Sequence, residues 1–201
     1  MFIGCIFKIE DDVRMDALMI QLIDRIYRIV IDSGIDCWLL PYHIYATGDQ
    51  RGVIECIQNA KSRHEIGENT NCSLLKYFIE AYGQVGTPEF EKAQHNFIKS
   101  MAPYSLICYL FQVKDRHNAN IMLDNEGHII HIDFGFIFDI SPGGNMKFEK
   151  APFKLNNEMI ELMGELGTNS PGFIHFAQMF GQCFLAVRSR IDEIEAIAYL
   201  M

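Results

Sequence analysis

Apolar residues recur along the chain with two different periods, and these predict a mixed α and β fold. Between residues 12 and 31 they stand three or four positions apart, which predicts an amphipathic helix capped by Asp11 or Asp12. Further helices are expected over 73–82, 88–112, 157–163, 173–187 and 191–200. Short apolar runs predict buried strands over 2–9, 52–57, 121–123 and 129–132.

Three segments interrupt this pattern. Residues 36–46 favour two short strands separated near Pro41, and the polar residues 59–71 favour a loop between two lobes. Residues 139–152 contain two prolines and two consecutive glycines, which predicts a second loop. The chain therefore divides most naturally after the strand that ends near residue 57.

Composition limits the classes of function. The 201 residues are 49% hydrophobic, enough for one large domain or two small lobes that share a cleft. A net charge of −9 argues against a nucleic-acid partner, because phosphate backbones select basic surfaces. Six scattered cysteines without a CxxC pair indicate reduced thiols in a cytosolic compartment. No apolar run reaches the length of a membrane span, and no signal peptide is evident.

Carboxylates and amides flank the last two predicted strands. Asp115 and Asn120 precede one strand, the turn 125–127 follows it, and Asp133 follows the next strand. A hairpin would bring these three side chains to one end of a small sheet. Hard oxygen ligands there suit Mg²⁺, and an aspartate beside a metal-bound phosphate suits phosphoryl transfer.

Other chemistries have less support. The spacing of His117, His128 and His131 does not match common zinc patterns. The serine-hydrolase elbow GxSxG, the Rossmann GxGxxG and the Walker GxxxxGK[ST] motif are all absent from the sequence. Lys8 on a strand and Asp16 on the next helix form a pair of the kind that holds ATP phosphates, although two ordinary surface charges would look the same.

Two motifs then identify a resemblance. DRHNAN at 115–120 and HIDFG at 131–135 resemble the catalytic and metal-binding loops of the phosphatidylinositol 3- and 4-kinase superfamily. FKIEDDVRMD at 7–16 is similar to the lysine strand and following helix of that superfamily, and GVIEC at 52–56 is similar to its hinge. The longer stretches 96–118 and 128–155 are most like type III phosphatidylinositol 4-kinases, the alpha type in particular.

The resemblance implies a two-lobed protein-kinase-like α+β fold. Residues 1–57 would form a truncated N-lobe and hinge, and residues 58–201 a mostly helical C-lobe with the catalytic loop, the DFG segment and the activation loop. Because the chain begins at the lysine strand, the preceding strands and the phosphate-covering loop are expected to be missing, as are the last helices of the C-lobe. We therefore expect a fragment of a larger enzyme.

The resemblance also implies a role for individual residues. Lys8 would contact ATP phosphates and pair with Asp16. Asp115 would accept or orient the proton of the inositol hydroxyl, and His117 would stabilise the transferring phosphoryl group or share that role. The remaining assignments are the hinge at Glu55, Cys56 and Ile57, metal ligands at Asn120 and Asp133, and substrate contacts at Lys147, Lys150 and Lys154.

The implied reaction transfers the γ-phosphate of ATP to the 4-hydroxyl of phosphatidylinositol, with Mg²⁺ or Mn²⁺. The protein would be cytoplasmic and peripheral to the plasma membrane or the Golgi and endoplasmic reticulum, with adaptor or scaffold proteins bound elsewhere on the parent enzyme. Departures from the family pattern at Glu10, Met15, Pro103 and Ala119 remove no catalytic group. The alternatives are a non-catalytic fragment that binds nucleotide or protein, and a protein kinase of the related large family, against which the loop 133–149 argues.

Overall fold

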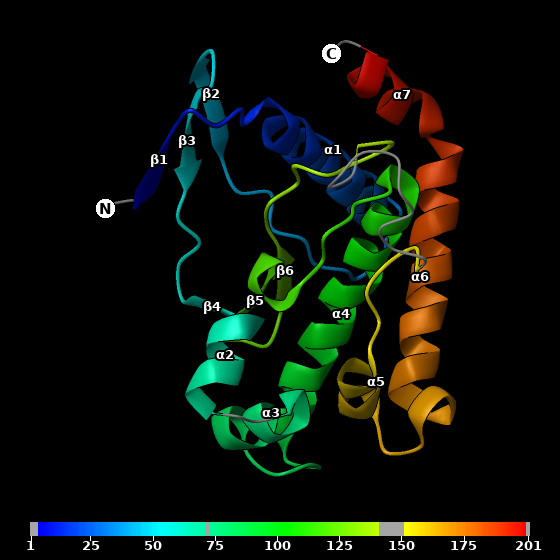
Figure 1. Cartoon of the computed structure of the whole chain (residues 1–201). Helices are drawn as coiled ribbons and strands as arrows, with labels where there is room; N and C mark the ends of the chain where they lie inside the picture. Colours follow the sequence, from blue (N-terminus) through cyan, green and yellow to red (C-terminus); the bar gives the residue numbers. More distant parts are fainter. Residues whose placement is uncertain (1–3, 71–72, 141–150, 200–201) are drawn as a thin grey trace.

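The computed structural model describes residues 4–70, 73–140 and 151–199 (Figure 1). Within them the chain forms seven α-helices, two short 3-10 helices and six strands, which confirms the mixed α and β composition. The helices are α1 (Arg14–Asp32), α2 (Arg63–Thr70), α3 (Leu74–Tyr82), α4 (Pro88–Phe111), η1 (Asn118–Asn120), α5 (Asn157–Met163), η2 (Gly167–Asn169), α6 (Pro171–Ser189) and α7 (Ile191–Tyr199).

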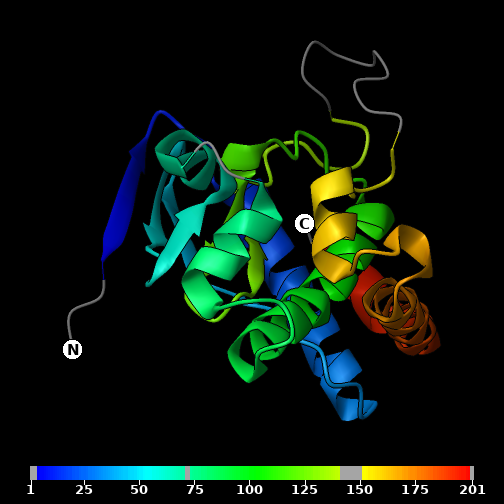
Figure 2. The ribbon, with the colours of Figure 1, turned by 90° about the horizontal axis from the view of Figure 1, so that it is seen from below.

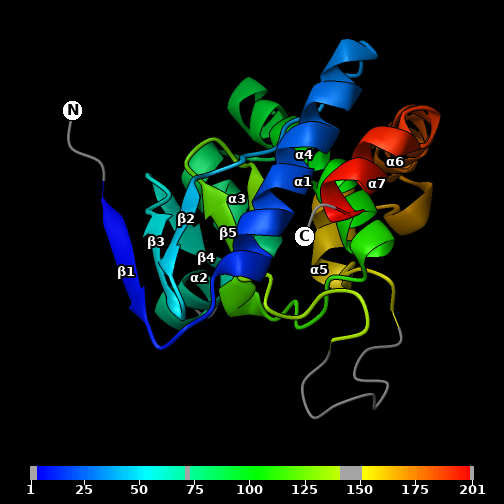
Figure 3. The ribbon, with the colours of Figure 1, turned by 90° about the horizontal axis from the view of Figure 1, so that it is seen from above.

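The first sheet is antiparallel with the strand order β1-β3-β2. Its strands are β1 (Cys5–Ile9), β2 (Ile44–Gly48) and β3 (Arg51–Glu55). Strand β1 lies at the outer edge, on the side away from α6 and α7 (Figures 2 and 3). Phe7 is 74% exposed, so the prediction of a buried strand here was wrong. Within the described chain, no element covers the outer face of this edge strand, and an apolar sequence alone cannot reveal that.

The second sheet contains the predicted hairpin. Strands β4 (Ala60–Ser62), β5 (Ile121–Asp124) and β6 (Ile129–His131) pair in that order, all antiparallel. The turn between β5 and β6 includes Gly127 at φ +94°, a left-handed conformation that favours glycine. A Cβ on Gly127 would lie 2.8 Å from the carbonyl oxygen of Ala93 on α4. The hairpin therefore sits directly against that helix.

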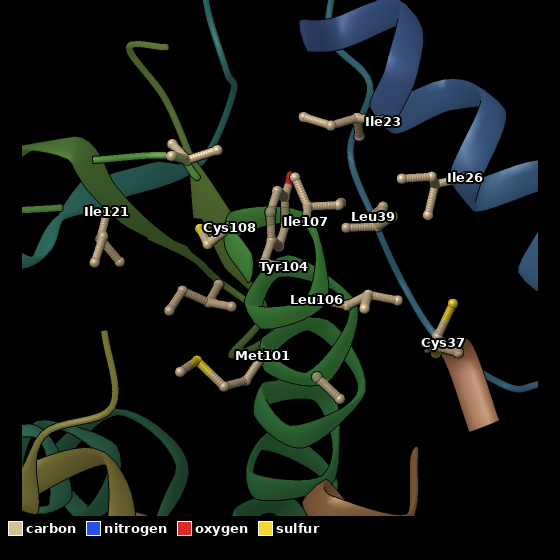
Figure 4. Close-up of a cluster of buried hydrophobic side chains, with 14 of the residues drawn as sticks. Ile23, Ile26, Cys37, Leu39, Met101, Tyr104, Leu106, Ile107, Cys108 and Ile121 are labelled. Carbon is tan, nitrogen blue, oxygen red and sulfur yellow. The ribbon is translucent and has the colours of Figure 1, made fainter. Parts of the chain in front are cut away.

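Helix α4 is the centre of the core. Thr87 caps it by accepting a hydrogen bond from the Phe90 amide, Pro88 begins it, and it continues through Pro103 as predicted. Figure 4 shows Tyr104, Leu106 and Ile107 of α4 between Ile121 of the hairpin and the side chains of α1. Burying these apolar groups removes them from water, which is the main force that holds hairpin and helices together.

The segment at residues 35–43 differs from the prediction. We expected two strands over 36–46, but only β2 forms a strand, beginning at Ile44. Cys37, Leu39 and Tyr42 are instead buried at the edge of the core, with Leu39 lying between α4 and α1 in Figure 4. The apolar run is thus explained by packing against helices and not by strand pairing.

The predicted loop over residues 59–71 instead contains strand β4 and helix α2. Ser62 and Glu65 form a capping box: the Glu65 carboxylate accepts from the Ser62 amide at 2.7 Å, and the Ser62 hydroxyl accepts from the Glu65 amide at 3.1 Å. Arg63 is 8% exposed and forms an ion pair with Glu158 of α5 at 2.7 Å. This contact joins residues 95 positions apart, and a local sequence pattern does not reveal it.

This buried pair gives a pH-dependent stability. Burial alone would raise the pKa of Glu158, but the contacts with Arg63 and Asn156 outweigh it and hold the pKa below its ordinary 4.5. A lowered folded-state pKa stabilises the fold above the unfolded-state value, and this stabilisation is lost as the pH falls through the folded-state value. We therefore expect Glu158→Gln to destabilise the fold by about 3 kcal/mol at pH 7, because the largely buried ion pair between Arg63 and Glu158 is lost.

Urea denaturation at pH 7 and at about pH 3.5 tests this expectation. The difference between wild type and Glu158→Gln should shrink as the pH falls, because the wild-type carboxylate becomes increasingly protonated as the pH approaches its lowered pKa. Glu161→Gln, an exposed substitution on the same helix, should change neither value appreciably. An equal loss of stability for Glu158→Gln at both pH values would contradict the assignment.

The remaining helices match their predictions closely. Ser73, Asn156 and Ser170 accept hydrogen bonds at the starts of α3, α5 and α6. At the start of α1 the cap position is Val13, although the Asp12 carboxylate accepts from the Arg14 amide at 3.1 Å. No helix among the described residues combines the length and apolar character that crossing a membrane requires.

Candidate active site

A cleft of about 630 Å³ opens between the two sheets. Its upper wall comes from β1, β3 and the start of α1, and its lower wall from the β5–β6 hairpin and the residues after it. Seven of the predicted site residues line it: Lys8, Asp16, Glu55, Cys56, Ile57, Asn120 and Asp133. The segments 6–57 and 120–136, which are far apart in the sequence, thus meet at one cavity.

Asp115 and Asp133 share an uncommon backbone conformation. Their φ values are 60° and 61°, in the left-handed region that costs a non-glycine residue free energy. Aspartate tolerates this region better than most residues, and such outliers concentrate at functional sites. The Asp133 side chain lies at the cleft, whereas Asp115 lies in the adjacent loop before η1.

Asn120 joins these two loops. Its side-chain amide nitrogen donates to the Asp115 carbonyl at 3.0 Å, so the amide oxygen faces away from that carbonyl. The backbone carbonyl of Asn120 accepts a hydrogen bond from the amide of Ile132, the residue before Asp133, at 3.1 Å. At 6% exposure, Asn120 is held between the predicted catalytic residue and the second predicted metal ligand.

Lys8 has a different ion-pair partner from the predicted one. Its ammonium lies 2.8 Å from the carboxylate of Asp11, not against Asp16. The hydrogen bond with Asp11 is the main cause that raises the Lys8 pKa, and Asp133 and Asp16 add smaller attractions. The turn after β1 brings Asp11 back over the strand, three residues from Lys8, so the nearest carboxylate is a local one.

Asp16 instead faces the DFG segment. Its carboxylate accepts from the Phe134 amide at 2.6 Å. Burial raises the Asp16 pKa and the nearby Asp133 raises it further, while the Phe134 hydrogen bond and Lys8 act in the opposite direction. Asp16 thus joins helix α1 to the backbone that follows Asp133. The Lys8 ammonium interacts with the carboxylates of Asp16 and Asp133 only through longer-range electrostatic attraction.

The predicted hinge residues divide into two groups. The amides of Glu55 and Cys56 already donate to the carbonyls of His43 and Gly4, each at 2.9 Å. The Glu55 side chain also binds His43, with 2.6 Å between its carboxylate and Nδ1, and this hydrogen bond lowers the Glu55 pKa. Among the three residues, the described bonds therefore leave the Ile57 amide as the donor for a base in the cleft.

His117 faces Asp115 at the end of the catalytic loop. Its Nδ1 accepts from the Ala119 amide at 3.2 Å, which places the proton of a neutral ring on Nε2. Nε2 lies 3.6 Å from the Asp115 carboxylate, and the side chain is 54% exposed. His117 can therefore present an N–H group to a ligand beside Asp115.

The predicted substrate lysines are only partly described. Lys147 and Lys150 lie outside the described residues. Lys154 is described, and its ammonium donates to the side-chain oxygen of Asn118 at 2.7 Å. Lys154 thus lies against the predicted catalytic loop, at the residue next to His117.

Sequence reasoning missed two residues that hold the loops in place. The ammonium of Lys114 donates to the carbonyl of Phe138, and the buried guanidinium of Arg116 donates to backbone carbonyls beside Asp133. Both flank Asp115 in the sequence. A basic residue next to the predicted catalytic aspartate was the available signal, but the acceptors are carbonyls 16 to 24 residues away.

The other two histidines near the site are structural. His131 is buried and stacks on Tyr104 with 4.9 Å between ring centroids, and burial lowers its pKa well below the ordinary value. His128 stacks on Trp38 at 4.1 Å and binds the Asp124 carboxylate at 2.9 Å. Across the described ranges, no group of three or more histidines, cysteines or carboxylates is arranged to hold a metal.

Comparison with known proteins agrees with this geometry. Residues 3–197 match the phosphatidylinositol 3- and 4-kinase family. The chain belongs to this family. Its relatives include phosphatidylinositol 4-kinase STT4 of Saccharomyces cerevisiae, 45% identical over 95% of the chain, and phosphatidylinositol 4-kinase alpha 1 of Arabidopsis thaliana, 42% identical over 98%. Phosphatidylinositol 4-kinase beta of Rattus norvegicus is 41% identical over 99%.

This family member is much shorter than those relatives. The chain spans 10% of the length of the yeast and Arabidopsis proteins and 24% of the rat protein. The aligned part nevertheless includes every residue that lines the cleft.

Proposed function

We propose that this chain carries the catalytic core of a lipid kinase that transfers the γ-phosphate of ATP to the 4-hydroxyl of phosphatidylinositol. The convergence of Asp115, Asn120 and Asp133 below a cleft whose upper wall carries Lys8 is the observation that supports it most strongly. The names of the relatives supply the acceptor, since each is a phosphatidylinositol 4-kinase.

The cleft offers both apolar and charged groups to a nucleotide. Ile54, Met122 and Ile132 provide apolar surface in the same cleft as Ile57, which suits a purine ring and its hydrogen-bonding edge. Lys8 stands farther along the cleft beside Asp16 and Asp133, so the phosphates would extend toward it. We infer that residues 1–57 and 58–201 act as the two lobes that close on this nucleotide.

The donor set fits a divalent cation. The amide oxygen of Asn120 and the carboxylate of Asp133 are hard oxygen ligands, which suit Mg²⁺ and also Mn²⁺. A cation bound there would neutralise phosphate charge and help to align the γ-phosphate. The contribution of the protein is to hold the two oxygen donors at a fixed separation, through the Asn120 bonds to Asp115 and Ile132.

Asp115 and His117 would act on the acceptor hydroxyl. In this proposal the Asp115 carboxylate orients the inositol hydroxyl and accepts its proton as the new bond to phosphorus forms. The Nε2–H group of His117 donates to the oxygens of the transferring phosphoryl group, where negative charge is concentrated. Positioning and charge stabilisation account for most of the expected rate enhancement.

The lipid would enter beside the catalytic loop. Lys154 places a positive charge one residue from His117, within reach of the phosphate of a phosphatidylinositol headgroup. Lys147 and Lys150 lie outside the described residues and remain proposed contacts. We further propose peripheral membrane attachment on the cytoplasmic side and adaptor proteins bound to other parts of the parent enzyme.

A kinase assay on vesicles tests the reaction. Radiolabelled ATP and Mg²⁺ are supplied with vesicles that contain phosphatidylinositol, and the product is deacylated and chromatographed to separate the 3- from the 4-phosphate. We expect the 4-phosphate from this chain or from a longer chain of the same protein. Labelling at the 3-position would overturn the proposed regiochemistry, and a serine-peptide acceptor in place of lipid tests the protein-kinase alternative. Inactivity of both lengths would favour a non-catalytic binding module.

A further inference from the structure

The guanidinium of Arg116 lies buried between the two loops that carry Asp115 and Asp133. Only 4% of the residue is exposed. Its Nη1 donates to the carbonyl of Ile132 at 2.8 Å, its Nη2 donates to the carbonyl of Asp133, and its Nε donates to the carbonyl of Lys114 at 3.0 Å. One side chain therefore joins the residue before Asp115 to Asp133 itself.

The surroundings of this charge are unusual. The described hydrogen bonds of Arg116 all go to backbone carbonyls, and its guanidinium carbon lies 5.5 Å from the centre of the Phe134 ring. Burying a cation against neutral acceptors costs more free energy than filling the same space with an apolar side chain. The arrangement is therefore better explained by the position it imposes on the loops than by a gain in overall stability.

The two loops that Arg116 holds together each contain a residue with a strained backbone. Asp115 immediately precedes Arg116, and Asp133 supplies one of its acceptors; both have left-handed backbones. Such conformations persist when surrounding contacts enforce them. At Asp133 these contacts are the Arg116 bond to its own carbonyl, the Arg116 bond to the carbonyl of Ile132, and the Asp16 bond to the next amide.

The geometry points to Arg116 as a positioning residue for the metal site. It holds the backbone of Asp133 in the left-handed conformation, so that the carboxylate faces the cleft near Asn120 and can bind a divalent cation with its phosphates. Arg116 itself does not line the cleft and would not touch the nucleotide. The metal part of this inference rests on the proposed function, whereas the backbone part does not.

Lysine cannot replace arginine in this role. The three carbonyls are bound by three different nitrogens of one planar group, and a single ammonium cannot reproduce that fork. We therefore expect Arg116→Lys, which keeps the charge, to be as defective as Arg116→Met. Loss of the groups that orient metal ligands typically weakens metal binding by about 10–100-fold.

Hydrogen exchange without any ligand tests the backbone part. Amide exchange over residues 132–136 is compared among wild type, Arg116→Lys and Arg63→Lys, a control at a buried arginine that binds Glu158 away from the cleft. We expect faster exchange at Phe134 and Gly135 in Arg116→Lys alone. Unchanged exchange there, or a uniform increase across the chain, would overturn the inference.

A second measurement tests the metal part. Binding of a fluorescent ATP analogue is titrated with Mg²⁺ and repeated in EDTA. Wild type should bind more tightly with Mg²⁺. In Arg116→Lys the Mg²⁺ concentration for half of this effect should rise about 10–100-fold, while binding in EDTA stays the same.

The outcomes separate the two proposals. If wild type binds no nucleotide under either condition, both the proposed function and the metal part of the inference fail. Hydrogen exchange still decides the backbone part. If wild type responds to Mg²⁺ and Arg116→Lys responds identically, Arg116 does not position the metal site. A loss of binding in EDTA as well would indicate general structural damage, and would also overturn it.

Discussion

Replacing Asp133 with asparagine should reduce phosphoryl transfer by about 10³-fold while the fold stays intact. The substitution keeps the size of the side chain but removes the negative charge that would hold a divalent cation against the phosphates. Preorganised charge at a reacting phosphate accounts for losses of this size when one group is removed. The carboxylate lies at the cleft, exposed to ligand, so its loss should cost little stability.

The assay is lipid phosphorylation by the active chain length, with thermal unfolding measured in parallel. Asp139→Asn makes the same chemical change at an exposed site six residues later, outside the cleft, and should retain wild-type activity. If Asp133→Asn kept more than about a tenth of the wild-type rate, the proposed metal ligand would be wrong. A matching loss in Asp139→Asn would show that the assay reports charge in this segment and not metal binding.

Replacing Gly127 with alanine should destabilise the fold by about 2–5 kcal/mol. Two costs add at this position. A left-handed backbone costs an alanine roughly 1–2 kcal/mol relative to glycine, and φ here is +94°. The new Cβ would also lie 2.8 Å from the Ala93 carbonyl oxygen, so the hairpin would have to move from α4, at a further cost of about 1–3 kcal/mol.

Gly86 provides a matched control for this change. Its φ is +89°, close to that of Gly127, but a Cβ there would meet no atom within 4 Å. Gly86→Ala should therefore show the conformational cost alone, and the difference between the two variants, measured by urea denaturation, isolates the contact with α4. Equal destabilisation would mean that the hairpin does not rest on the Ala93 backbone. Because Asn120 and Asp133 flank the hairpin, Gly127→Ala should also weaken nucleotide binding, whereas Gly86→Ala should not.

Local patterns were sufficient for much of the fold. The apolar stripe of α1, the Thr87-Pro88 start of α4 and the turn at Asn125–Gly127 each combine a periodicity with residues suited to an element's end. Such signals act within a few residues, so they can be read without knowing the tertiary structure. Helix α2 was missed for the opposite reason: its amphipathic pattern is weak, and the ion pair that stabilises it involves Glu158 in a distant helix.

The candidate site also combines features that the local sequence predicts with features that depend on the tertiary structure. Carboxylate and amide side chains at the ends of two short apolar runs predicted a hairpin with its polar groups at one end, and the structure brings Asn120 and Asp133 to one cleft. The partners of charged residues were not predictable in this way. Long flexible side chains can reach several acceptors, and the one they bind depends on which backbone lies nearby in three dimensions.

The sequence by itself predicted most of the helices, the hairpin and the candidate site residues beside it, because these patterns depend on residues close together along the chain. Only the tertiary structure decided that Lys8 binds Asp11, that Asp16 reaches the Phe134 amide, and that Arg116 joins the two loops. The last two contacts join segments 118 and 17 residues apart. The Asp16 contact arises when α1 packs into the shared core, whereas the hairpin itself brings Arg116 back to Asp133. In neither case does the sequence indicate which backbone group the side chain binds.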